Sequence, residues 1–202
     1  MSLWRTSALS LLAWVVLTSS AVPSHADTWV FDKQHTEIRF SWDHLGLSRK
    51  SGRFLDMDGT LEFSPTEPEV GRIDVGIRTS SVATGVRELD DHLKSPDFFG
   101  ANANPRITFK STGVTKTGDR TGEVNGNLTI AGVTKPVTLD VTWNFTGEYP
   151  LSAINPGYQG KWVSGFSAKT IIARSDFGLK RAIPLISDEI QITIEAELLR
   201  KD

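Results

Sequence analysis

The chain has 202 residues, and 22 lysines and arginines against 24 aspartates and glutamates give it a formal charge of -2 at pH 7. Acids and bases are mixed along the sequence without a basic stripe, so we expect no nucleic-acid partner. The chain has no cysteine, which excludes disulfide bonds and cysteine-ligated metal sites.

Residues 1–26 have the composition of a cleavable export signal. Arg5 provides a positive charge, residues 8–17 form an apolar core too short to span a bilayer, and Ser24-His25-Ala26 offers small residues for cleavage. We therefore expect a signal peptide over 1–26 and one domain over 27–202. That domain is long enough to bury a core without disulfides. The leader and the lack of cysteine favour the periplasm.

Eight further segments have the composition and period of β-strands. Apolar and polar residues alternate in them, most clearly around Ile190, Ile192 and Ile194, as in a strand with one face in water. We expect residues 47–52 to be a polar link, and Gly59 to mark a bend or bulge. The predicted strands are residues 28–42, 54–63, 73–78, 107–111, 124–130, 133–145, 162–172 and 190–198.

The pattern changes between the third and fourth of these strands. Val86, Leu89 and Leu93 recur at spacings of three and four among charged residues, which predicts a short amphipathic helix ending before Pro96. The segment 97–100, with sequence Asp-Phe-Phe-Gly, follows as an apolar plug on a loop.

These elements predict an all-β fold: a lipocalin-like eight-stranded antiparallel β-barrel with one short amphipathic helix. Short turns favour an up-and-down order of strands. The interior of such a barrel is either packed with side chains or wide enough for one small ligand. If it is hollow, we expect these residues to line a ligand-binding tunnel: Phe40, Trp42, Phe54, Phe63, Ile77, Phe98, Phe99, Phe109, Leu128, Leu139, Val141, Phe166 and Ile192.

Residues suited to catalysis or metal binding are few. His35, His44 and His92 are too few for a closed zinc site in a chain without cysteine, although a three-histidine site stays open. Asp32 and Asp43, beside the first two histidines, are the candidates for an acid–base pair inside the barrel. The sequence has no P-loop, dinucleotide fingerprint or nucleophile elbow. We therefore expect no catalytic residue, no metal and no cofactor beyond a bound lipid.

Six stretches, in a fixed order along the chain, carry a resemblance to a known family. They are residues 29–40, 91–99, 105–111, 126–137, 174–179 and 187–190. Together they resemble the YceI-like family, bacterial periplasmic proteins with a lipocalin-like barrel that bind polyisoprenoids and related lipids. The series spans essentially all of residues 27–202, and its order carries more weight than any one motif. The link 147–159 is longer than the family pattern, and we expect it to alter the mouth of the barrel.

The resemblance implies a non-enzymatic periplasmic carrier of a long-chain amphiphile: a polyisoprenoid, an isoprenoid quinone or a fatty acyl derivative. It leaves open a homodimer and transient contact with the membrane or with membrane-bound electron-transfer proteins. Two other interpretations remain. One is an isomerase- or cyclase-type enzyme on a lipocalin-like barrel, and the other is a packed barrel that binds partners or protects against stress.

Overall fold

The computed structural model describes residues 26–201, so the expected signal peptide lies almost entirely outside the described residues. Within them no helix is long and apolar enough to cross a membrane. Eleven strand segments make one sheet. They are β1 (Asp27–Phe31), β2 (Glu37–His44), β3 (Ser48–Phe54), β4 (Met57–Phe63), β5 (Arg72–Arg78), β6 (Val82–Ala83), β7 (Arg106–Lys116), β8 (Thr121–Ile130), β9 (Val133–Glu148), β10 (Trp162–Ala173) and β11 (Glu189–Arg200).

The sheet closes into a barrel because β11 pairs with β1 as well as with β10. The first three strands of the ring are each broken in two: β1 with β2, β3 with β4, and β5 with β6. Counted this way, eight strands form the ring, every pairing is antiparallel, and strands adjacent in sequence are adjacent in space. The predicted fold class is confirmed.

The prediction of a polar link over residues 47–52 is wrong, because β3 begins at Ser48 and pairs with β2 along its length. Most side chains of β3 are exposed, which hides the alternation that marks the other strands. The register of β4 against β5 also runs unshifted through Gly59, so no bulge lies there. A Cβ on Gly59 would collide with the carbonyl oxygen of Asp74, so this close backbone approach requires glycine.

The predicted helix is α1 (Arg87–Lys94). Asp90 ties the helix to the segment before it, because its Oδ1 accepts hydrogen bonds from the backbone N and the Oγ1 of Thr84, both at 2.6 Å. Leu93 is buried against Phe40 and Trp42 of the barrel, while the charged residues of the helix face outward. A helix of eight residues is marginal alone, so this docking holds it in place.

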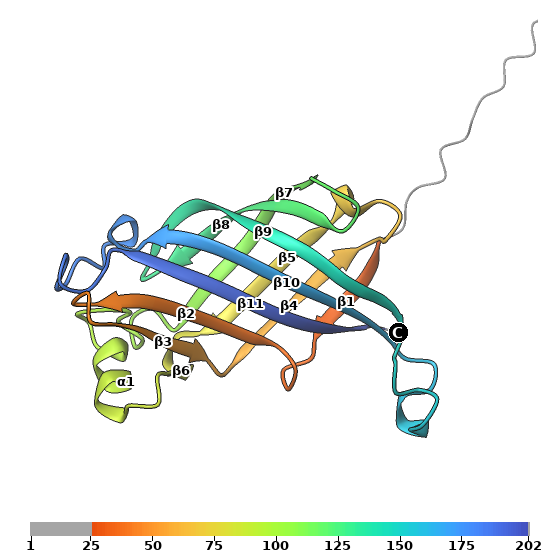
Figure 1. The fold of residues 1–202 in the computed structure, drawn as a ribbon, viewed down its shortest axis with the longest axis horizontal. Helices are drawn as coiled ribbons and strands as arrows, with labels where there is room; N and C mark the ends of the chain where they lie inside the picture. The colour runs from red at the N-terminus through yellow and green to blue at the C-terminus, as the bar shows by residue number, and fades with distance from the viewer. Residues whose placement is uncertain (1–25, 202) are drawn as a thin grey trace, which may run out of the picture.

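Figure 1 shows that the two ends of the barrel carry different segments. The helix end carries α1, the turn between β2 and β3, and the loop 178–188 between β10 and β11. The opposite end, called here the termini end, carries the start of β1, the end of β11 and the loop 149–161 between β9 and β10. The loop 149–161 contains a 3-10 turn at Pro156–Tyr158. A second 3-10 turn, Arg174–Phe177, lies between the end of β10 and the loop 178–188.

Candidate functional site

An apolar cavity of about 590 Å³ runs inside the barrel. Its volume lies within the range of about 300–1,000 Å³ that is typical of small-molecule sites. All eight strands of the ring contribute to its wall, as do α1 and the segments that follow it. The interior is therefore hollow, as the carrier interpretation requires, and residues of both barrel ends border the cavity.

All the residues that the sequence marked as tunnel-lining lie in the wall of this cavity. Their contact with a ligand stays a prediction. They are Phe40, Trp42, Phe54, Phe63, Ile77, Phe98, Phe99, Phe109, Leu128, Leu139, Val141, Phe166 and Ile192.

Other apolar residues of the wall, absent from the predicted set, share the same faces of the same strands. In β11, for example, Ile190 and Ile194 line the cavity on either side of the predicted Ile192. Strict alternation along each strand would have found them, because residues i and i+2 face the same side of a sheet. Further wall residues of this kind are Ile38, Leu61, Ile73, Val75, Ile107, Val124, Ile130, Trp143, Ala168 and Ile172.

Aromatic rings gather at the helix end of the cavity. Phe99, from the predicted plug, packs edge-on against Phe54 at 5.8 Å between ring centroids and against Phe40 at 6.4 Å. Phe98 lies edge-on to His92 of α1 at 4.9 Å. Edge-to-face pairs at these distances are attractive beyond the area they bury. The plug is therefore part of the cavity wall and joins α1 to the barrel.

Two glycines give wall aromatics the room to lie flat across the sheet. A Cβ on Gly52 would lie 2.6 Å from Cζ of Phe40, which is its direct cross-strand partner. A Cβ on Gly126 would collide with the ring of Phe109. Because both rings lean over a glycine, they leave space in the middle of the barrel, and a larger residue at either glycine would push a ring into it.

Arg174 is a buried cation in the wall of the cavity, 5 % exposed. Its guanidinium donates four hydrogen bonds to backbone carbonyls: Leu179 at 2.6 Å, Ser187 and Arg181 at 2.9 Å, and Ile186 at 3.0 Å. Burial lowers the pKa of Arg174 from its ordinary value, which the nearby Asp188 partly offsets. The side chain thus ties together the loop 178–188. In the sequence, Arg174 stood only as the first residue of the family-like stretch 174–179, and no role was assigned to it.

Charged residues border the cavity where it reaches the surface. At the helix end they are Lys50, His92 and Arg181, all exposed, together with the half-buried His44. Arg181 and His92 share the carboxylate of Asp97, at 3.0 Å and 3.9 Å. The wall is therefore apolar in the middle and polar at its ends, the arrangement expected for an amphiphile.

The candidate acid–base pair of the first two strands lies outside the cavity. His35 Nδ1 is 2.9 Å from Asp32 Oδ2, but the pair sits in the turn between β1 and β2, and neither side chain lines the cavity. His44 does line the cavity, while Asp43 accepts a hydrogen bond from the backbone N of Gly46 at 2.7 Å. The structure thus brings together one of the two predicted pairs, and places it in solvent.

The three histidines considered for a metal site do not come together. His35 lies between β1 and β2, His44 at the end of β2, and His92 on α1. Over residues 26–201, no three histidine, aspartate or glutamate side chains gather closely enough to hold a metal ion.

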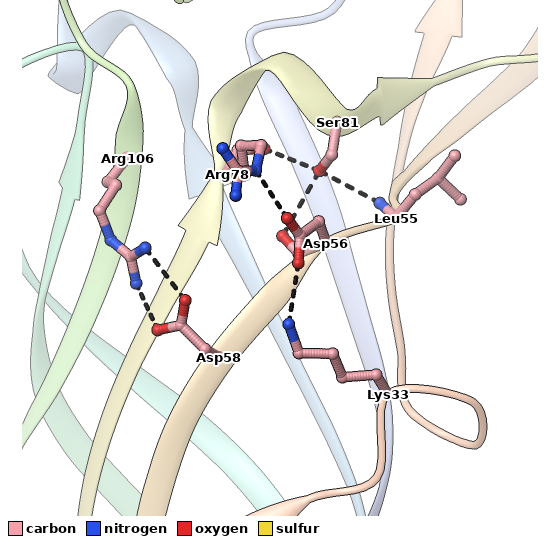
Figure 2. Close-up of polar contacts among 7 residues, drawn as sticks. All are labelled: Lys33, Leu55, Asp56, Asp58, Arg78, Ser81 and Arg106. Carbon is pink, nitrogen blue, oxygen red and sulfur yellow. Dashed lines mark hydrogen bonds and ion pairs between the residues drawn. The ribbon is translucent and has the colours of Figure 1, made fainter.

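A network of ion pairs lies on the outer face of the barrel (Figure 2). Asp56 accepts hydrogen bonds from Arg78 at 2.6 Å and Lys33 at 3.0 Å, and these donors lower the pKa of its carboxyl group. Arg106 binds both oxygens of Asp58, at 2.5 Å and 3.1 Å, which lowers the pKa of that carboxyl group. All these groups face water, and pairs of this kind contribute little to stability. They fasten β4, β5 and β7 together away from the cavity.

The loop 149–161 does not form part of the cavity wall, so the expectation that the link 147–159 alters the barrel mouth is wrong. Residues at the two ends of the loop contact each other instead. Tyr149 and Tyr158 stack at 4.2 Å between centroids, and the backbone N of Tyr149 donates to the carbonyl of Lys161 at 2.8 Å.

Comparisons with known proteins agree with this geometry. A "UPF0312 protein" of Pectobacterium atrosepticum is 37% identical over 199 residues, which cover 98% of each chain. The crystal structure of a Campylobacter jejuni YCEI protein matches with a TM-score of 0.68 and 33% identity, over 79% of this chain and 90% of that one.

A third match is to the structure of a polyisoprenoid binding domain from Saccharophagus degradans. Its TM-score is 0.61 over 88% of this chain and all of the other, and at 14% identity it shows a shared fold. The description "YceI-like domain" applies to the family that matches residues 29–198, a span that includes every strand of the barrel. The chain therefore belongs to the YceI-like family.

Proposed function

We propose that this protein binds and carries a long-chain amphiphile, with the apolar tail inside the barrel and the polar head at a mouth. The ligand classes are a polyisoprenoid, an isoprenoid quinone or a fatty acyl derivative. The observation that carries the proposal is the continuous apolar cavity of about 590 Å³, bordered by polar side chains where it reaches the surface. The family and its polyisoprenoid-binding structural neighbour support a lipid as the ligand.

The free energy of such binding comes from the tail. Each methylene group moved from water into the cavity contributes about 0.8 kcal/mol, so ten of them contribute about 8 kcal/mol. Association costs are estimated at roughly 4–15 kcal/mol, so a tail needs to fill most of the cavity to bind tightly. One methylene more or less changes affinity only modestly, so we expect selection by overall length and head group rather than by chain detail.

The proposed role is non-enzymatic and periplasmic. The location rests on the composition of residues 1–26. The absence of a His–Asp pair among the described cavity-wall residues supports binding over acid–base catalysis. A homodimer and contact with electron-transfer proteins stay predictions from the resemblance.

Native mass spectrometry tests the ligand. We expect protein purified without detergent to carry additional mass that organic extraction removes, and that fragments as a lipid. Apo protein that also fails to take up prenyl lipids, quinones and fatty acids would overturn the proposal.

A pair of neighbouring substitutions in β10 tests where the ligand lies. Ala168 lines the cavity and Lys169 is exposed on the outer face of the same strand. Ala168→Trp should fill part of the cavity and reduce uptake of a fluorescent prenyl or acyl probe by tenfold or more, about 1.4 kcal/mol. Lys169→Trp should bind as the wild type does. Equal binding by both variants, with both folded by circular dichroism, would place the ligand outside the barrel.

A further inference from the structure

Three exposed leucines project from one tip of the barrel. Leu45 and Leu47 lie in the turn between β2 and β3, where they are 46% and 81% exposed, and Leu185 in the loop 178–188 is 63% exposed. The two segments are joined, because the backbone N of Leu45 donates to the carbonyl of Leu185 at 2.9 Å. Leu45 and Gly46 both have positive φ, 61° and 68°, which makes the turn tight and directs its flanking side chains outward.

Exposed basic side chains lie in the same two segments as these leucines. Residues 43–50 and 178–188 contain Arg49, Lys50, Lys180 and Arg181, all exposed. None of the first three forms an ion pair with any residue between 26 and 201, while Arg181 pairs with Asp97.

The two acids within these segments, Asp43 and Asp188, accept hydrogen bonds from neighbouring groups of the protein. Asp43 accepts from the backbone N of Gly46, and Asp188 accepts from the N and Oγ of Ser175. The two segments hold four bases and two acids, so the tip combines exposed apolar side chains with a net positive charge.

The same two segments border the cavity. His44 at the end of β2 and Lys50 in β3, on either side of the turn, belong to its wall. Arg181, Ala182 and Ile186 of the loop do so as well. A lipid that leaves the cavity at this end therefore emerges beside the exposed leucines.

The other end of the barrel lacks this combination. Ile154 is 80% exposed in the loop 149–161, but that loop does not border the cavity. Where the cavity does reach the surface at the termini end, its border is formed by the turn 116–122 and by Pro68 and Gly71. There the bases Lys116 and Arg120 are accompanied by an acid, Asp119. One large apolar side chain of these described segments is exposed, Val70 at 41%, in place of the three leucines of the tip.

We infer that the tip formed by residues 44–50 and 180–186 docks on the surface of an anionic lipid bilayer, so that the ligand passes directly between bilayer and cavity. This inference rests on the proposed function. The partner is identified by chemistry: leucines enter the boundary between head groups and acyl chains, and the net positive charge of the tip is attracted to acidic head groups. A long-chain lipid has negligible solubility in water, so a cavity whose mouth lies at the bilayer avoids exposing the tail.

Vesicle co-sedimentation tests the docking surface with a matched control. We expect the wild type to bind vesicles of phosphatidylcholine with phosphatidylglycerol, and to bind vesicles of phosphatidylcholine alone much more weakly. Leu47→Ser with Leu185→Ser should weaken binding about tenfold or more, because both side chains lose their place in the apolar boundary. Ile154→Ser removes a side chain as exposed as Leu47 from the other end and should leave binding unchanged.

A second variant separates charge from apolar contact. Lys50→Gln with Lys180→Gln should remove most of the preference for anionic vesicles, about tenfold, while leaving the weak binding to neutral vesicles as it was. Absence of wild-type binding to anionic vesicles, or equal weakening by Ile154→Ser and the double leucine variant, would overturn the inference.

Uptake of a tail-labelled prenyl probe from detergent, without vesicles, is measured in parallel. Normal uptake by a wild type that does not bind vesicles rejects the docking surface and leaves the proposed function standing. Failure of uptake rejects the proposed function itself.

Discussion

The hydroxyl of Thr79 is buried without a hydrogen-bond partner among the described residues, in a side chain only 1% exposed. A buried polar group left unpaired costs about 1–3 kcal/mol. Thr79→Val keeps the shape and removes the hydroxyl, while the backbone N of residue 79 keeps its bond to the carbonyl of Pro105 at 3.0 Å. We expect an increase of about 1 kcal/mol in the free energy of unfolding, measured by urea denaturation. Thr79→Ser, which keeps the hydroxyl, should not stabilise; stabilisation by both variants would refute the explanation.

The pair of His35 and Asp32 gives a small pH dependence to stability. The hydrogen bond that His35 donates to the Asp32 carboxylate raises the pKa of His35 above 6.5. Because the folded state holds the proton more tightly, this stabilisation is complete below the unfolded pKa and is lost as the pH rises through the folded one. Since the pair is largely exposed, the effect should stay below about 1 kcal/mol.

We therefore expect the melting temperature of the wild type to fall slightly more between about pH 6 and about pH 8 than that of His35→Asn. Differential scanning calorimetry at matched ionic strength measures both. Identical pH profiles would show that the pair contributes nothing.

At the scale of single elements, the loop 178–188 depends on one side chain. Arg174→Met keeps much of the apolar stem but leaves one buried and three partly buried carbonyls without their donor. We expect faster amide hydrogen exchange in the loop and a loss of about 3 kcal/mol or more of stability. Arg174→Lys has fewer donors in a different geometry. Its stability and its rate of amide exchange in the loop should therefore lie between those of the wild type and of Arg174→Met. Unchanged exchange in the loop would show that other contacts hold it.

Elements also differ in how far the sequence could predict them. The long strands were recognisable because water on one side and the lumen on the other impose alternation on them. β3 was missed because its segment Ser48–Phe54 is exposed on nearly every residue. The breaks that split β1 from β2 and β3 from β4 depend on pairing with distant strands, which no local pattern records.

The residues of the candidate site also differ in how far the sequence could predict them. Apolar wall residues follow from strand parity, so the predicted set falls on the cavity. The polar residues were not found in this way. Arg174 and Arg181 lie between β10 and β11, in a segment whose path no local pattern records. Lys50 shares the face of Phe54 on β3, but it lies in the segment that the sequence suggested to be a polar link. The leucine tip likewise depends on contact between Leu45 and Leu185, which are 140 positions apart in sequence.

For the whole molecule, filling the cavity should stabilise the fold. A ligand present at about a hundred times its Kd adds about 2.7 kcal/mol to the free energy of unfolding. In a domain of this size that corresponds to about 5–10 °C in Tm. We expect this shift on adding the native lipid to delipidated protein, and a much smaller one in Ala168→Trp. A Tm that does not respond to a lipid shown to co-purify would mean that the lipid does not bind the folded barrel.

The pairing of β1 with β11 brings the two ends of the described chain together. Trp29 lies opposite Arg200, and the backbone N of Lys201 donates to the carbonyl of Thr28 at 2.8 Å. A short linker between these points, with new ends cut in the loop 149–161, should give a circular permutant that folds, because that loop lies outside the cavity wall. In the natural order the ring cannot close until its last strand is available. Closure therefore joins residues far apart in sequence, which predicts slow folding. It also predicts that the barrel stays open until the whole chain is available to fold.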